Sequence, residues 1–430
     1  MNSKIQNFDQ LAITPERKAL LTIAEAGLQA IDTKEAIRKL VEIRGSVLKL
    51  GDQQVDLDSV EKLIFIGVGK CAADAGTAIG NILGNRITRG VLVDVKKCEE
   101  IPSIQTFCGT HPLPSDENLK ATEAIIGCLQ GLTERDLVIF AISGGGSTLL
   151  FLPEDKSNRE EISVFNALTN AGATIGELNI VRKHLSLARG GHLAKAAYPA
   201  RLISLIFSDV PGNDLTSISS GPTVRDGTTV EDAERILAKY NVLQTCNIER
   251  CGLVETPKEE KYFANAAVVM AASNVGALEA MKRSAETMGF RAEIRDAKLT
   301  GDATLVAEMV AGAIHAAPPG SVLLWGGETT VTVRIPGSGG RNLTVSATAL
   351  DSVREGEAIL SLASDGRDHG PYAGAICDMI TKDGMAKAGI DWQKYLDGNN
   401  TYPLFEKAGN YLMTGDTGSN VSDLIIALKK

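Results

Sequence analysis

The feature that most constrains the fold is a series of short, uninterrupted apolar runs in the first half of the chain. A strand that is apolar throughout is buried on both faces, which is typical of a parallel sheet covered by helices. The expected strands occupy residues 62–66, 90–95, 103–108, 136–142 and 201–207. The expected helices occupy residues 14–31, 33–49, 115–132, 159–171 and 176–189. This alternation predicts an α/β fold.

The chain has 430 residues, too many for one ordinary core. A polar stretch at 242–262, with Pro257 and a charged run, interrupts the pattern. A second α/β rhythm follows, with strands at 265–271, 290–294, 321–325, 330–335 and 358–363, and helices at 275–287, 302–315 and 342–353. We therefore expect two α/β domains, 1–245 and 246–430.

Composition excludes several classes of protein. A formal net charge of -9 argues against a nucleic-acid partner. No apolar run reaches the roughly 18 residues that span a bilayer, and the first ten residues lack the apolar core of an export signal. Seven cysteines without a C-x-x-C pair are typical of reduced thiols. We expect a cytoplasmic monomer or homodimer that acts on small molecules, with no membrane partner.

The first candidate loop is the turn Gly67-Val68-Gly69-Lys70, which follows an expected strand. Its glycines allow a tight entry into a helix, whose free N–H groups attract anions. With Asp94 at the end of the next strand, the turn fits a dinucleotide fingerprint. Lys70 points instead to a phosphate or carboxylate. A plain strand–helix connection is the third interpretation.

The second candidate loop, residues 143–147, also follows a buried strand. Three glycines in succession can direct backbone N–H groups at an anion, and the flanking serines can donate hydrogen bonds. The loop consists of Ser143, Gly144, Gly145, Gly146 and Ser147. We interpret it as an anion cradle in preference to a flexible turn.

The third loop contains Asp209, Gly212 and Asp214, beyond another apolar strand. Its two carboxylates can hold Mg²⁺ directly or through water. Aspartate is equally common in turns, where it caps the local backbone. The sequence leaves these two interpretations open.

The second half of the chain adds Glu328, Arg341, Asn342 and Asp365. Arg341 lies in a glycine-rich loop at an expected helix start, and its forked guanidinium suits an oxygen-rich anion. The loop at 414–420 is expected to precede a short helix and to offer a further anion site. The basic residues at 182–184, with Arg189, are expected on a solvent-exposed helix face.

Read together, these segments resemble the glycerate 2-kinase family, the class II glycerate kinases with a C-terminal MOFRL domain. The matching segments run in the family's order over residues 67–424. They are GVGKCA (67–72), HPLPSDEN (111–118), SGGGSTLL (143–150), LNIVRKHLSLARGGHLA (178–194), SDVPGNDLTSISSGPTVRD (208–226), SNVGALEA (273–280), GGETTVTV (326–333), GGRN (339–342) and TGDTGSNVSDL (414–424).

The resemblance implies an N-terminal Rossmann-like domain, a smaller C-terminal α/β domain and substrate binding in a cleft between them. It implies ATP and Mg²⁺ as cofactors, D-glycerate as substrate and 2-phospho-D-glycerate as product. The family's catalytic lysine falls on Lys70 and its loop arginine on Arg341. We expect these two cations to flank the transferred phosphoryl group, with Asp209 or Asp214 as metal ligands.

The sequence departs from the family pattern at 341–344 and 365–375, where the usual R-N-Q-E and D-G-x-D-G-P-T-D segments are altered. A kinase of another small hydroxy acid is therefore an alternative. An NAD(P)H-dependent hydroxypyruvate reductase is a second, because of the turn at 67–72. A non-catalytic nucleotide-binding sensor is a third.

Overall fold

The computed structural model describes residues 3–155, 160–333 and 335–430. The chain forms two compact units, which we name after their candidate residues. The lysine unit comprises Ala36–Ser208 and Asn213–Ala271, and the arginine unit comprises Met1–Glu35, Asp209–Gly212 and Ala272–Lys430. These units divide the chain at other positions than the expected domains, 1–245 and 246–430.

The lysine unit is built on a six-stranded sheet in the order β6-β5-β4-β7-β8-β9. Neighbouring strands from β4 to β8 pair in parallel. Every residue of β4 and β7 is buried, as their apolar sequences predicted. The strands are β4 (Leu63–Val68), β5 (Arg89–Asp94), β6 (Ile104–Cys108), β7 (Leu137–Ser143), β8 (Arg201–Phe207) and β9 (Ala266–Ala272). The predicted parallel α/β fold is confirmed.

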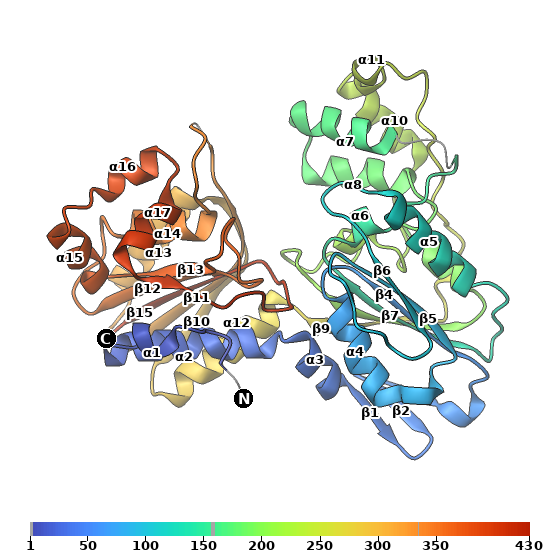
Figure 1. Cartoon of the computed structure of the whole chain (residues 1–430), viewed down its shortest axis with the longest axis horizontal. Coiled ribbons are helices and arrows are strands. Elements are labelled where there is room, and N and C mark those ends of the chain that lie inside the picture. The colour runs from blue at the N-terminus through green and yellow to red at the C-terminus, as the bar shows by residue number, and fades with distance from the viewer. Residues whose placement is uncertain (1–2, 156–159, 334) are drawn as a thin grey trace. The chain divides into compact units, whose positions relative to one another are not determined.

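Four helices of this unit form a group of their own. α7, α8, α10 and α11 lie together beyond the sheet (Figure 1) and share a core that includes Val164, Val181 and Leu237. The unit's helices are α4 (Ala72–Leu83), α5 (Asp116–Cys128), α6 (Gly146–Leu149), α7 (Glu160–Asn170), α8 (Ile175–His184), α9 (His192–Ala197), α10 (Val230–Lys239) and α11 (Val242–Cys246). Residue 159, the expected start of α7, lies outside the described residues.

The helix expected at 33–49 is wrong beyond residue 40. α3 (Thr33–Leu40) ends there, and an antiparallel meander follows, β1 (Val41–Arg44), β2 (Val47–Leu50) and β3 (Gln53–Asp56). Gly45 and Gly51 adopt φ of +63° and +61° at the two turns. A left-handed residue cannot continue an α-helix, and glycine adopts this conformation at little cost.

The arginine unit contains a mixed six-stranded sheet in the order β10-β11-β15-β12-β13-β14. β10 and β11 pair in parallel, and the other pairs are antiparallel. The strands are β10 (Arg291–Asp302), β11 (Ser321–Thr330), β12 (Glu357–Ala363), β13 (Gly374–Asp378), β14 (Tyr411–Leu412) and β15 (Asp423–Lys429). The strands expected at 321–325 and 330–335 do not form separately, because β11 runs on through Gly326 and Gly327; residue 334 lies outside the described part.

Helices cover both faces of this sheet. Figure 1 shows α1, α2 and α12 on one face, and α13, α14, α16 and α17 on the other. The helices are α1 (Phe8–Leu11), α2 (Pro15–Ala30), α12 (Asn274–Thr287), α13 (Ala303–Ala316), α14 (Arg341–Ala349), α15 (Met379–Lys387), α16 (Trp392–Asp397) and α17 (Thr401–Ala408). Buried Arg17 of α2 forms two hydrogen bonds with Asp378, at 2.6 and 2.7 Å, so the start of the chain is part of this unit. Within the described ranges, no helix is long and apolar enough to cross a membrane.

Candidate active site

The two glycine loops of the lysine unit meet where the strand order of its sheet reverses. β4 lies between β5 and β7, and the chain extends the sheet through β5 and β6 before it returns to β7. Ligands of open α/β sheets bind at such a switch point, beyond the carboxyl ends of the strands. Lys70 follows β4 and Gly144 follows β7, and the Lys70 N–H donates to the Gly144 carbonyl at 3.0 Å.

Gly69 allows this close approach. Its φ is +117°, and a Cβ there would overlap the Ser143 hydroxyl and carbonyl. The Ser143 hydroxyl accepts a hydrogen bond from the Cys71 N–H at 3.2 Å. Gly67 lies inside β4, where a Cβ would be 3.1 Å from Cγ of Leu92, so its role there is packing.

The carboxylate of Asp94 binds the helix N-terminus that was predicted as a site for an external anion. Its carboxylate accepts hydrogen bonds from the N–H groups of Ala73 at 2.9 Å, Val95 at 2.6 Å and Lys96 at 3.2 Å. Asp94 is fully buried, and this burial raises its pKa. In a dinucleotide fingerprint this carboxylate would hold a ribose hydroxyl. Here it is committed to the backbone, which argues against the reductase interpretation.

The Lys70 side chain runs over Gly145, next to His111. A Cβ on Gly145 would lie 3.1 Å from Cγ of Lys70 and 3.5 Å from Cδ2 of His111. Burial, followed by the charges of Lys70 and Arg182, lowers the pKa of His111 to about 4. A neutral imidazole can exchange hydrogen bonds with a ligand and adds no charge. Sequence reasoning did not predict that His111 lies beside Lys70.

A strained segment supports the second glycine loop. Ser219, Ser220 and Gly221 have φ of +52°, +59° and +57°. The Ser219 hydroxyl donates to the Ser143 carbonyl at 2.6 Å, and the Ser220 hydroxyl donates to the Ser147 hydroxyl at 2.9 Å. Serine in the left-handed region is strained, and such strain concentrates at functional sites. These two hydrogen bonds thus fix the conformation of loop 143–147. We call Lys70, His111, residues 143–146 and Ser219 the lysine site.

In the arginine unit, carboxylates from two strands hold Arg341. Its Nε donates to Oδ2 of Asp423 at 2.7 Å, and its NH1 donates to Oε1 of Glu328 at 2.8 Å. Burial opposes the charged form of Arg341, but the charge and hydrogen bond of Asp423, together with the charges of Glu328 and Asp368, outweigh burial, so the Arg341 pKa is raised. Burial raises the pKa of Asp423 to about 6. Glu328 and Arg341, two of the predicted site residues, therefore lie in contact.

Asn342 extends the same network. Its side chain donates to Oδ1 of Asp423 at 2.8 Å and to Oδ1 of Asp368 at 3.3 Å. Asp368 also accepts from the Leu343 N–H at 2.8 Å, at the start of α14. We call Glu328, Arg341, Asn342, Asp368 and Asp423 the arginine site. Sequence reasoning missed both Asp368 and Asp423. Asp423 lies in the family-like segment 414–424, and Asp368 lies in the altered segment 365–375.

Asp209 and Asp214 were the predicted magnesium ligands. The Asp214 carboxylate accepts from the Thr216 N–H at 3.0 Å and the Ser217 hydroxyl at 2.6 Å, which fits a turn cap. Among the described residues, no group of three His, Cys, Asp or Glu side chains is placed to hold a metal ion. A carboxylate has about four lone pairs, so Asp214 retains room for at most a supplementary ligand bond. Asp209 belongs to the arginine unit and Asp214 to the lysine unit, and their role as Mg²⁺ ligands stays a prediction.

The remaining loop residues serve the backbone. Gly212 adopts φ of +83° beside the side chain of Lys298. Asp365 caps a turn by accepting from the Arg367 N–H at 3.0 Å. The segment at 414–420 precedes strand β15, so the short helix expected after it is wrong. The hydroxyl of Ser422 donates to the Asp209 carbonyl at 2.5 Å.

The basic residues at 182–189 are not a solvated face, contrary to expectation. Lys183 and Arg189 are 4% and 0% exposed. Lys183 pairs with Asp226 at 2.7 Å, and Arg189 pairs with Glu161 at 2.9 Å. α8 packs against α7 and α10, and this packing places Lys183 in the interior.

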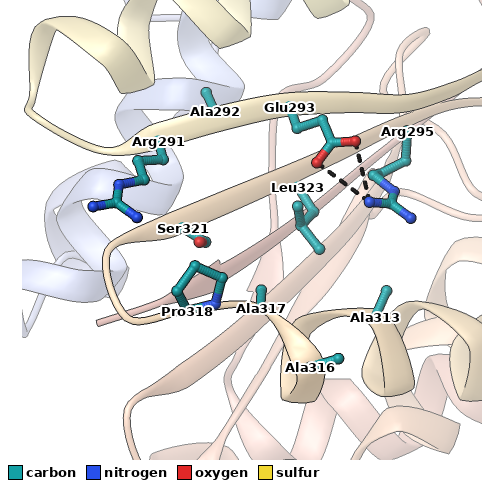
Figure 2. Close-up of a pocket in the computed structure, with 10 residues that line it drawn as sticks. All are labelled: Arg291, Ala292, Glu293, Arg295, Ala313, Ala316, Ala317, Pro318, Ser321 and Leu323. Atoms are coloured by element: carbon teal, nitrogen blue, oxygen red, sulfur yellow. Dashed lines mark hydrogen bonds and ion pairs between the residues drawn. The ribbon is translucent and has the colours of Figure 1, made fainter.

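A cavity of about 520 Å³ lies apart from the arginine site. It is lined by the starts of β10 and β11 and by residues around the end of α13. Figure 2 shows Glu293 and Arg295 paired at its wall, with Arg295 NH1 at 3.1 and 3.2 Å from the two carboxylate oxygens. Glu328 is near the opposite end of β11, so the cavity does not belong to the arginine site.

Comparison with known proteins agrees with this geometry. Two family models match the chain: a domain of unknown function, DUF4147, over residues 19–250, and the MOFRL family over residues 321–423. The D-glycerate 2-kinase of Thermotoga maritima is 36% identical over 385 residues, which is 86% of this chain and 91% of the relative. A putative hydroxypyruvate reductase of Agrobacterium vitis is 35% identical over 84% of this chain and 86% of the relative.

A solved structure shares the whole architecture. The crystal structure of glycerate kinase from Thermotoga maritima has a TM-score of 0.84 and is 31% identical to this chain. The likeness covers 96% of this chain and 99% of that one.

Proposed function

Because the chain belongs to the glycerate kinase family, we propose that it transfers a phosphoryl group from ATP to D-glycerate and forms 2-phospho-D-glycerate. The observation that carries this proposal is the lysine site at the switch point of a parallel sheet. There Lys70 lies against the glycine loop at 143–146. Asp94 accepts hydrogen bonds from the backbone and is therefore unavailable to a dinucleotide ribose.

Phosphoryl transfer needs alignment and charge neutralisation more than covalent chemistry from the protein. Lys70 supplies a cation in contact with the loop at 143–146, so it can stabilise the negative charge of the transferred group. Arg341 is proposed as the second cation. Asp423 and Glu328 bind Nε and NH1 and thereby fix the direction of the guanidinium.

Mg²⁺ bound to ATP would neutralise the phosphates and help to orient them. Asp209 and Asp214 remain the proposed contacts to the ion, directly or through water. The protein's own contribution is to bind both substrates and to exclude water, which suppresses wasteful ATP hydrolysis. A cytoplasmic location and a monomeric or homodimeric state are part of the same proposal.

A hydroxypyruvate reductase is the second candidate, because a relative carries that name. The commitment of Asp94 to three backbone N–H groups disfavours it. Two assays on the purified chain decide between the candidates. We expect ADP release that depends on D-glycerate, and no oxidation of NADH or NADPH with hydroxypyruvate. The opposite pair of results would replace the kinase by the reductase.

A further inference from the structure

Among the residues that the structure describes, no carboxylate forms an ion pair with the Arg182 guanidinium of α8, although the charge of nearby Glu161 acts on it. Its Cζ lies 3.9 Å from the ring centroid of Phe165, so the ring covers one face of the group. Its Nε is buried and finds no hydrogen-bond partner in the part of the chain that the structure describes. Burial and the nearby charge of Arg189 lower the pKa of Arg182 to about 10, which still leaves it charged at pH 7.

The carboxylates around Arg182 are already engaged. Glu161 forms an ion pair with Arg189 at 2.9 Å, and Arg189 also donates from NH1 to the Arg182 carbonyl at 3.0 Å. Asp226 is paired with Lys183 at 2.7 Å. Arg182 is half-buried and, among the described basic residues of this region, has no ion pair while Lys183 and Arg189 each have one. A partly desolvated charge favours a counter-charge, so a ligand anion is the expected partner.

α8, which carries Arg182, packs against Ile218–Ser220, the segment whose serines support the glycine loop of the lysine site. The charges of both Lys70 and Arg182 act on His111, and the Lys70 side chain and His111 flank the same glycine, Gly145. The site thus combines two cations with an uncharged imidazole. Such a set suits a small molecule that carries one permanent anion and hydroxyl groups.

We propose that Arg182 binds the carboxylate of the hydroxy-acid substrate through its guanidinium. This inference rests on the proposed kinase reaction and assigns a substrate-binding residue to it. A guanidinium matches a carboxylate with two parallel hydrogen bonds, and the contact with the Phe165 ring restricts the orientation of Arg182. We expect His111, which lies beside Gly145, to exchange hydrogen bonds with a hydroxyl group of the same ligand.

Several observations favour the carboxylate over an ATP phosphate. Arg182 lies against an aromatic ring of α7, and the glycine loop at 143–146, whose backbone suits phosphates, is a separate segment that contacts Lys70. With Lys70 committed to the transferred phosphoryl group, Arg182 is the cation that remains for the acceptor. The acceptor's only permanent charge is its carboxylate.

Arg182→Met tests the proposal through substrate selectivity. We expect the KM for D-glycerate to rise about 10- to 100-fold, the range for losing a charge-assisted hydrogen bond, with the KM for ATP changed by less than about 3-fold. D-Glyceramide, the uncharged amide, is the second probe. The preference of the wild-type enzyme for D-glycerate over D-glyceramide should shrink by the same factor. Arg225→Met, on an exposed arginine, is the control and should match the wild type.

Arg182→Lys keeps the charge without the forked geometry, so it serves if the methionine variant does not fold. We expect it to show a smaller rise in the KM for D-glycerate and an unchanged KM for ATP. A folded variant with unchanged selectivity, or with a rise confined to the KM for ATP, would overturn the role of Arg182. Phosphorylation of D-glycerate by the wild-type enzyme tests the reaction itself, so the two failures are distinguishable.

Discussion

The guanidinium of Arg341 is held by Asp423, with Nε 2.7 Å from Oδ2. Asp423 is 1% exposed, and its second oxygen accepts from Asn342 at 2.8 Å. The last strand of the sheet thus fixes the direction of a cation at the start of α14. Glu328 binds the other end of the guanidinium from β11 but is much more exposed.

Asp423→Asn should lower the activity of the enzyme through its effect on Arg341. Loss of the carboxylate removes the charge-assisted bond that orients Arg341, so we expect kcat to fall by about 10- to 100-fold. Glu328→Gln is the matched control and should lower kcat by less. The Glu328 carboxylate is half exposed, and ion pairs of exposed carboxylates contribute little. Equal losses of kcat in the two variants would contradict this ranking.

The same variant carries a pH dependence of stability. Burial raises the pKa of folded Asp423 to about 6, above the unfolded value of about 3.9. Its contribution to the free energy of unfolding is therefore full below pH 4 and is lost as the pH rises through 6. We expect the wild type to lose stability relative to Asp423→Asn over that window, measured by urea unfolding. If the wild type instead gained stability relative to Asp423→Asn as the pH rose, the raised pKa of Asp423 would be refuted.

Lys70→Met should lower kcat by about 100-fold or more, the usual scale for a group that stabilises developing charge. Lys120→Met, on an exposed lysine of α5, is the control and should leave kcat unchanged. The unfolding midpoints of both variants should stay close to that of the wild type. Near-normal turnover in the Lys70 variant would remove this residue from the mechanism.

His111 reports on the cations around it. Its folded pKa of about 4 lies below the unfolded value of about 6.5, so its contribution to stability is present above pH 6.5 and is lost as the pH falls toward 4. In Lys70→Met the pKa of His111 should rise but stay below 6.5, since burial is the larger cause of the shift. Titration of the ring by NMR measures both values. An unchanged pKa would place Lys70 too far away to act on the ring.

Gly69→Ala should disrupt the lysine site. The new Cβ would overlap the Ser143 carbonyl at a positive φ, so we expect a loss of roughly 1–3 kcal/mol in stability and of most activity. Gly127→Ala, in α5, is the matched control: a Cβ there meets nothing within 4 Å. It should stabilise the protein by about 0.5–1 kcal/mol. Similar destabilisation in both variants would show that the conformation of Gly69 is not the cause.

The sequence predicted those parts of the fold that depend on local pattern. β4 and β7 are apolar almost throughout and buried throughout, and glycine turns follow both strands, although β4 runs two residues past its predicted end and includes Gly67. The meander after residue 40 was missed because left-handed turns at Gly45 and Gly51 outweigh a helical pattern. The candidate site was harder to predict from local pattern. Asp423 is 82 residues from Arg341, and its carboxylate resembles any other until the strands pair.

Backbone strain and burial also escaped prediction. Nothing in the sequence marks Ser219 as left-handed, and the basic run around Lys183 reads as a surface until α8 packs against its neighbours. Asp94 is the reverse case. Its position suggested a ribose contact, and only its three backbone hydrogen bonds show that the carboxylate is already in use.

The most direct test of the account is the position of the phosphate on the product. Purified enzyme would be incubated with ATP, Mg²⁺ and D-glycerate, and the product followed by phosphorus NMR against authentic 2- and 3-phosphoglycerate. We expect 2-phosphoglycerate from the wild type and a rate lower by about 100-fold from Lys70→Met. No phosphorylated glycerate, or a phosphate on the 3-hydroxyl alone, would contradict it.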